Sequence, residues 1–180
     1  MNTVEFLAKQ VPQDLLVPLS LCHYFDVQLL KTCSMHCVNL GLCFTANGGT
    51  LLCLMDLGFF GDPALTRDER LNNAYDDFRA FCRSERISCS QRRFRMTFLM
   101  KKSHGAYLTL KAYNGRVVTA WLANCALSAW SGEYPAHRLF GAWLQGQNLR
   151  PSDERLAPQA LAMLALARWF SLVERSPRCL

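Results

Sequence analysis

The residues best suited to bind a metal lie near the N-terminus, where thiols and imidazoles gather among apolar residues. They are Cys22, His23, Cys33, His36, Cys37 and Cys43. Structural zinc takes four such ligands, usually as two close pairs. Cys33 and Cys37 share one face of a predicted helix at i and i+4, but no second pair of that quality follows at the spacing of a zinc finger. We therefore predict no metal site and no cofactor, and keep a zinc-stabilised helical domain as an alternative.

Catalysis would need a nucleophile or a set of converging carboxylates. Cys89 lies between Arg86 and Arg92, and neighbouring cations lower the pKa of a thiol, so it is the most reactive cysteine expected. No cysteine-protease signature surrounds it. Asp76 and Asp77 are adjacent on a predicted helix, so they point about 100° apart, and we expect both on a solvated face. We predict no catalytic residues and favour a non-catalytic protein over an enzyme.

A basic central segment is the clearest functional signal. Between residues 86 and 132 the chain has eight cations and no Asp or Glu: Arg86, Arg92, Arg93, Arg95, Lys101, Lys102, Lys111 and Arg116. Residues 1–85 carry a net charge of −4 and residues 133–180 one of +2, so this segment dominates the net charge of +6. Charge segregated in this way attracts polyanions, and these eight residues are therefore the predicted nucleic-acid-binding residues.

Two phenylalanines interleave with these cations. Phe94 and Phe98 are spaced i, i+4, so we expect them to anchor a short helix to the core while the arginines face water. The nucleic-acid hypothesis requires five of the cations to lie on one exposed face: Arg92, Arg93, Arg95, Lys101 and Lys102.

A predicted helical fold positions these side chains. Apolar residues recur at helical spacing, and we expect helices over Val27–Phe44, Thr50–Phe59, Arg67–Arg86, Arg92–Met100, Ala112–Trp130 and Asp153–Glu174. Thr66 and Glu69 form a capping-box pattern before the third of these. Asn47-Gly48-Gly49 predicts a tight turn, because glycine tolerates positive φ. The predicted class is mainly α: one globular domain over residues 1–180 with about seven to nine helices, at most one short strand pair and a hinge near 146–151.

Composition narrows the setting of the chain. With 51% apolar and 19% charged residues, the 180-residue chain has the composition of a globular protein. It has nine cysteines, and an odd count without an export signal predicts reduced thiols and an intracellular, reducing compartment. No membrane association is predicted, since the longest apolar run, Leu156–Phe170, is interrupted by Pro158 and is too short to span a bilayer.

Two groups of short motifs occur in a recognisable order. The first covers residues 31–42 (KTCSMHCVNLGL) and continues into Asn-Gly-Gly at 47–49. The second covers residues 74–78, 88–94 and 111–123. Together, over about residues 25–175, they resemble uncharacterised, high-copy proteins of mobile-element origin from dinoflagellate algal genomes. The resemblance implies a piece of a longer transposon-type reading frame in which the acidic residues of a transposase are not recognisable. It also implies six family positions without an assigned role: His36, Asn39, Asn114, Gly115, Arg116 and Trp121.

Three function hypotheses follow from these observations. The leading one is a nucleic-acid-associated helical module of mobile-element origin without a complete active site, whose partners are DNA or RNA and the remainder of a larger protein. The second is a helical interaction or scaffold fragment, which predicts an exposed apolar patch on the order of several hundred Å². The third is the zinc-stabilised helical domain, which requires two further ligands beside Cys33 and Cys37.

Overall fold

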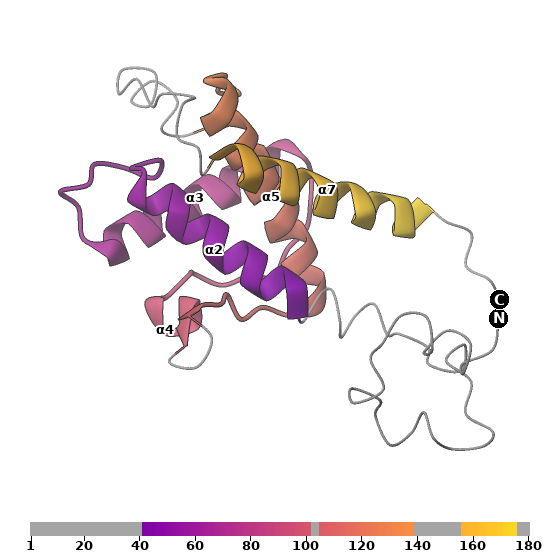
Figure 1. Ribbon diagram of the computed structural model, residues 1–180, viewed down its shortest axis with the longest axis horizontal. Coiled ribbons are helices and arrows are strands. Elements are labelled where there is room, and N and C mark those ends of the chain that lie inside the picture. Colours follow the sequence, from indigo (N-terminus) through magenta and orange to yellow (C-terminus); the bar gives the residue numbers. More distant parts are fainter. Residues whose placement is uncertain (1–40, 102–104, 139–155, 176–180) are drawn as a thin grey trace, which may run out of the picture. The chain divides into compact units, whose positions relative to one another are not determined.

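The computed structural model describes residues 41–101, 105–138 and 156–175, all within one compact unit, Met35–Leu180 (Figure 1). In chain order the elements are α2 (Cys43–Asp56), α3 (Arg67–Ser84), α4 (Met96–Leu99), β1 (Met100–Lys101), β2 (Gly105–Ala106), α5 (Ala112–Ser131) and α7 (Leu156–Arg175). The predicted mainly helical class is confirmed. The described ranges hold five helices, fewer than the about seven to nine expected for the whole chain. The strand pair is present, with β1 and β2 antiparallel.

Helix α5 lies at the centre of this arrangement and contacts α2, α3 and α7 (Figure 1). Its Trp121 is fully buried and anchors an aromatic core. The rings of Phe60, Phe78 and Phe94 surround the indole, with centroids 5.6, 5.4 and 5.7 Å away. Aromatic side chains bury large apolar areas, so this cluster ties the turn after α2, the middle of α3 and the segment before α4 to one helix.

Helix α3 forms as its local signals predict. The Thr66 N–H donates to Glu69 Oε2 at 2.8 Å, and the Glu69 N–H donates to Thr66 Oγ1 at 3.3 Å, which completes the capping box. Hydrogen bonds from Thr66 lower the pKa of Glu69. The helix ends at Ser84, two residues earlier than predicted, because Arg86 adopts φ +56°. The Ile87 N–H then donates to the Cys82 carbonyl at 2.9 Å, as in a Schellman motif.

The predicted turn at Asn47-Gly48-Gly49 is wrong, because α2 runs through all three residues. Gly48 lets another segment approach: a Cβ there would lie 2.7 Å from the backbone nitrogen of Tyr107. The Leu108 N–H donates to the Phe44 carbonyl at 2.9 Å, so the segment after β2 is hydrogen-bonded to α2 at this point. The glycine at position 48 therefore serves the close packing of the segment at Tyr107 on α2, and it does not form a turn.

The buried side chain of Asn47 serves the packing of α2 on α5. Its Nδ2 donates to the Gly115 carbonyl at 3.2 Å, and its Oδ1 accepts from Thr119 Oγ1 at 3.0 Å. Asn47 and Thr119 are completely buried. Buried polar groups need such partners, so this pair fixes the register of the two helices.

Other predicted elements meet the structure only in part. Most of Val27–Phe44 and all of the hinge near 146–151 lie outside the described residues, as do Cys22, His23, Cys33, His36 and Cys37. The predicted helix Arg92–Met100 is wrong in extent, since only α4 forms and the arginines precede it. Ala112–Trp130 is confirmed as α5, and Pro158 falls in the first turn of α7, where its missing N–H costs nothing. None of the helices in the described ranges is long and apolar enough to cross a membrane.

Candidate nucleic-acid interface

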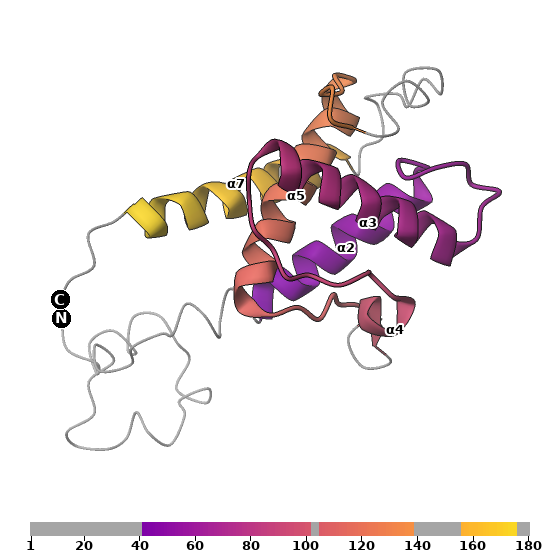
Figure 2. The ribbon, with the colours of Figure 1, turned by 180° about the vertical axis from the view of Figure 1, so that it is seen from behind.

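A groove of about 630 Å³ lies where three segments meet, the loop after α3, helix α4 and the strand-like segment before α5. Its lining residues are Ser90, Gln91, Arg92, Arg93, Phe98, Thr109, Leu110, Lys111 and Asn114, which we call the basic groove. Figure 2 shows the loop leaving α3 and passing α5 on its way to α4. Residues that are up to 24 positions apart in sequence therefore line one surface.

Side chains of helix α3 hold the loop in place by donating hydrogen bonds to backbone carbonyls of the loop. Arg79 Nη1 donates to the Cys89 carbonyl at 3.1 Å, and the Tyr75 hydroxyl donates to the Gln91 carbonyl at 3.1 Å. The opposite wall is fixed in the same way, since the Thr109 N–H donates to the Phe98 carbonyl at 3.0 Å. Both walls are thus held by bonds that leave the exposed side chains available.

Asn114, in the first turn of α5, forms the floor of the basic groove. It is only 4% exposed. Its Oδ1 accepts from Ser90 Oγ at 3.3 Å and from Cys89 Sγ at 3.4 Å, while its Nδ2 donates to Gln91 Oε1 at 3.3 Å. This one amide therefore links three consecutive loop residues to α5. Asn114 therefore has a structural role that its sequence context did not indicate.

Three of the eight predicted binding residues converge here. Arg92 and Arg93 come from the loop and Lys111 directly precedes α5, and all three are exposed. No Asp or Glu is among the described residues that line the groove. The N-terminus of α5 adds partial positive charge, because its N-cap residue makes no side-chain capping bond. The potential in the groove is therefore positive.

Of the five cations expected on one exposed face, only Arg92 and Arg93 are among the described residues that line the groove, and the other predicted residues are placed differently. Arg95 is exposed but does not line the groove, and Arg86 forms the left-handed turn at the end of α3. Arg116 lines a separate groove between α5 and α7, where its guanidinium lies 5.4 Å from the centre of the Tyr113 ring. The side chains of Lys101 and Lys102 lie outside what the structure describes.

The two phenylalanines separate in role. Phe94 is 3% exposed and stacks on Trp121, as expected for a core anchor. For Phe98 the same expectation is wrong, because its side chain is 47% exposed and lines the basic groove. The reason is that Phe94 precedes the four-residue helix α4, so the i, i+4 geometry of a longer helix does not hold.

Cys89 does not have the lowered pKa that its sequence neighbours predicted. Burial raises the pKa of the thiol, and the nearby cation is Arg79 rather than Arg86 or Arg92. The thiol group donates a hydrogen bond to Asn114 Oδ1, an amide oxygen that cannot act as a general base. The structure therefore supports a role for Cys89 in positioning the loop against Asn114, and the raised pKa of its thiol does not favour nucleophilic catalysis.

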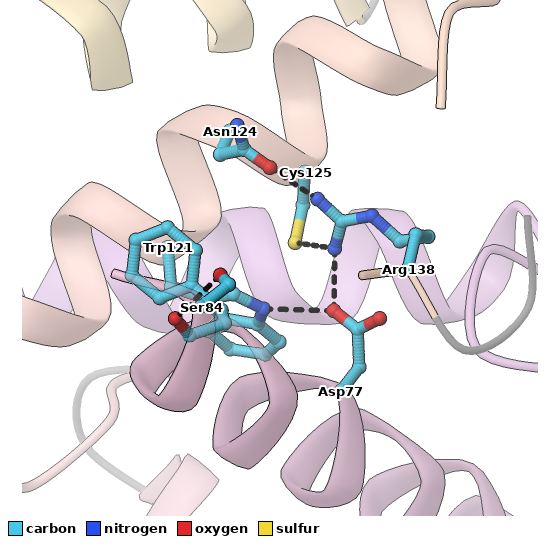
Figure 3. Close-up of polar contacts among 7 residues, drawn as sticks. Asp77, Ser84, Trp121, Asn124, Cys125 and Arg138 are labelled. Carbon is cyan, nitrogen blue, oxygen red and sulfur yellow. Dashed lines mark hydrogen bonds and ion pairs between the residues drawn. The ribbon is translucent and has the colours of Figure 1, made fainter. Parts of the chain in front are cut away.

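The prediction that Asp77 faces solvent is also wrong. Its side chain is fully buried and forms an ion pair with Arg138, while Trp121 Nε1 donates to Asp77 Oδ2 at 2.9 Å (Figure 3). Arg138 also donates to Asn124 Oδ1 and, at 2.9 Å, to Cys125 Sγ. Burial raises the pKa of the Cys125 thiol above its ordinary value. We call these five residues the buried polar cluster.

The sequence contained a signal for this burial. Asp77 lies three residues after Ala74 and four before Phe81, which puts it on the buried stripe of α3. Its partner Arg138, 61 positions away, was not singled out, since the turn after α5 that positions it has no motif. Burying an ion pair costs desolvation free energy, which hydrogen bonds to its remaining polar atoms offset. The cluster supplies such bonds to Nη1 and Nη2 of Arg138, while Nε has no partner in the described part of the chain.

Metal sites and relatives add no further candidate. In the described ranges no three His, Cys, Asp or Glu side chains gather closely enough to hold a metal ion. No protein-family model, no curated protein and no solved structure matches the chain.

Proposed function

We propose that this chain is a nucleic-acid-associated helical module and that the basic groove is its contact surface. The observation that carries the proposal is the convergence of Arg92, Arg93 and Lys111 from two separate segments on one groove without a lining carboxylate. Cations arranged in this way neutralise phosphates, which dominate the affinity for nucleic acids. Phe98 adds an exposed aromatic ring to the same surface.

The module as we propose it has no complete active site. Asp77 is bound to Arg138 and Trp121, so the adjacent Asp76 has no second carboxylate to act with at this place. The proposal also includes a mobile-element origin, which rests on the resemblance of the short sequence motifs to that group. It further includes more helices than the described ranges contain. A reducing, intracellular setting is supported by the free thiols of Cys82 and Cys125.

The test is a binding assay across a salt series. Labelled single-stranded DNA, duplex DNA and RNA are titrated by fluorescence anisotropy between 50 and 200 mM salt. Three phosphate contacts predict a slope of log K against log salt of roughly −2 for single strands, a loss of about 20-fold over this range. The double variant Arg92→Ala/Arg93→Ala should reduce the slope to roughly −0.7.

A matched control removes the same charge elsewhere. Arg67 and Arg83 are exposed residues of α3 that do not line the basic groove. The double variant Arg67→Ala/Arg83→Ala should bind as the original chain does. Negligible binding of every nucleic acid at low salt, or equal losses in the two double variants, would refute the proposal.

A helical interaction module is the second candidate function. The observation in its favour is an apolar groove of about 350 Å³ between α2 and α7, lined by Leu42, Ala46, Ala162, Ala165, Leu166 and Trp169. Leu42, which lines this groove, is 57% exposed, and this exposed apolar side chain supports the interaction hypothesis. Absence of any salt-dependent binding in the assay above would favour this function.

A further inference from the structure

The exposed position of Phe98 in the basic groove bears on whether the groove binds single-stranded or double-stranded nucleic acid. We infer that the groove binds an unpaired strand, with one base stacked on the Phe98 ring and the flanking phosphates on Arg92, Arg93 and Lys111. The inference rests on the proposed function and adds the class of ligand to it.

The ring is presented on a fixed backbone. The Phe98 N–H donates to the Arg95 carbonyl at 2.9 Å, and the Phe98 carbonyl accepts from the Thr109 N–H at 3.0 Å. The next residue, Leu99, is completely buried and anchors α4 in the core. Phe98 therefore cannot turn inward without breaking these contacts, and 47% of its side chain stays accessible beside the cations.

An exposed aromatic ring beside phosphate-binding cations matches the needs of single-stranded nucleic acid. Every base has a flat face that can stack on an aromatic ring, while arginine and lysine follow the backbone. In a duplex the bases are stacked on one another, so only the phosphates would reach this surface and the ring would contribute little. The volume of about 630 Å³ is in the range of sites that enclose a small ligand, which fits a short piece of one strand.

Polar groups complete the surface that a strand would contact. The hydroxyl-bearing residues Ser90 and Thr109 are exposed on the two walls and offer partners to sugars and base edges. The amides of Gln91 and Asn114 are bonded to each other, so the floor is already ordered before a ligand arrives. Such pre-organisation lowers the entropy lost on binding.

The experiment compares an unstructured single strand with a duplex of the same length and varies the ring at position 98. Phe98→Ala should weaken single-strand binding by about 5- to 150-fold and leave the salt slope and duplex binding unchanged. Phe98→Trp should keep the affinity and show tryptophan quenching, relative to the original chain, when the single strand binds. Trp130 provides the control, because it is 40% exposed and lies near the C-terminal end of α5. It lines neither the basic groove nor the groove that contains Arg116, so Trp130→Ala should leave the affinity for both forms of nucleic acid unchanged.

The outcomes separate this inference from the function on which it rests. Equal affinity for single strand and duplex, unaffected by Phe98→Ala but reduced by Arg92→Ala/Arg93→Ala, would overturn the inference and leave the proposed function standing. No binding of either form would overturn both. Circular dichroism would check that each variant is folded, which we expect because 47% of the Phe98 side chain is exposed.

Discussion

Adjacent glycines in α2 provide a direct test of how the groove is supported. Gly48 and Gly49 occupy the same helix, and replacing either by alanine removes the same backbone freedom. At Gly49 a new Cβ would meet nothing within 4 Å. At Gly48 it would lie 2.7 Å from the Tyr107 nitrogen and 2.8 Å from the Leu108 nitrogen. These are backbone atoms, which cannot move aside as a side chain can.

The two substitutions should therefore change stability in opposite directions. Gly49→Ala should stabilise the fold by about 0.5–1 kcal/mol, the difference between the two residues in a helix interior. Gly48→Ala gains the same propensity but overpacks, which typically costs about 1–3 kcal/mol, and strains the bond from the Leu108 N–H to the Phe44 carbonyl, worth about 1 kcal/mol. The two variants should differ by roughly 2–4 kcal/mol, or roughly 4–16 °C in Tm.

Urea denaturation followed by circular dichroism measures this difference, and the binding assay supplies a second readout. The segment that packs against Gly48, at Tyr107 and Leu108, continues through Thr109 to Lys111 in the basic groove. Gly48→Ala should therefore also weaken nucleic-acid binding. Gly49→Ala should leave it unchanged. If both variants are equally stable, the close approach of this segment to α2 is refuted.

Two further predictions concern buried groups of α3. Asp77→Asn keeps an acceptor for the Trp121 indole but leaves the charge of Arg138 buried, so it should cost about 3–5 kcal/mol in urea denaturation. Asp76→Asn, next to it and exposed, should stay within about 0.5 kcal/mol, and similar losses in both would contradict the assigned burial. Burial raises the pKa of Cys82 from an ordinary value of 9.0 to about 11. Its contribution to stability is therefore complete below about pH 9 and is lost as the pH rises towards 11. The urea midpoint should fall over that range and fall less in Cys82→Ala; an equal fall in both would show that another group titrates.

Elements whose signals are local were predicted well. Helix α3 has a capping box, acids in its first turn and an apolar stripe, all within its own residues, and the structure follows them to within two positions at its end. Helix α5 was predicted from the same kind of periodicity and ends at Gly132, which adopts the left-handed conformation. In both helices the decisive contacts are within a few residues of each other in sequence.

The predictions that failed depend on distant partners. Gly48 resembles a turn residue until the segment at Tyr107 packs against it, and Asp77 resembles a surface residue until Arg138 reaches it. Phe98 is exposed because α4 is too short to carry the expected helical stripe. Such outcomes are set by tertiary contacts that override local propensity, which no window of sequence contains.

The eight cations of the central segment have the same charge, but the structure does not bring all of them to one surface. At physiological ionic strength exposed charges are screened beyond about 8 Å, so a ligand responds mainly to the cations around the surface that it touches. Arg86 adopts the left-handed conformation in the turn that ends α3, and Arg116 packs over Tyr113 in another groove. Net charge therefore indicates the class of partner, and only the fold indicates which cations act together. In the proposed interface they are Arg92, Arg93 and Lys111, which line one groove because Asn114 holds the loop against the first turn of α5.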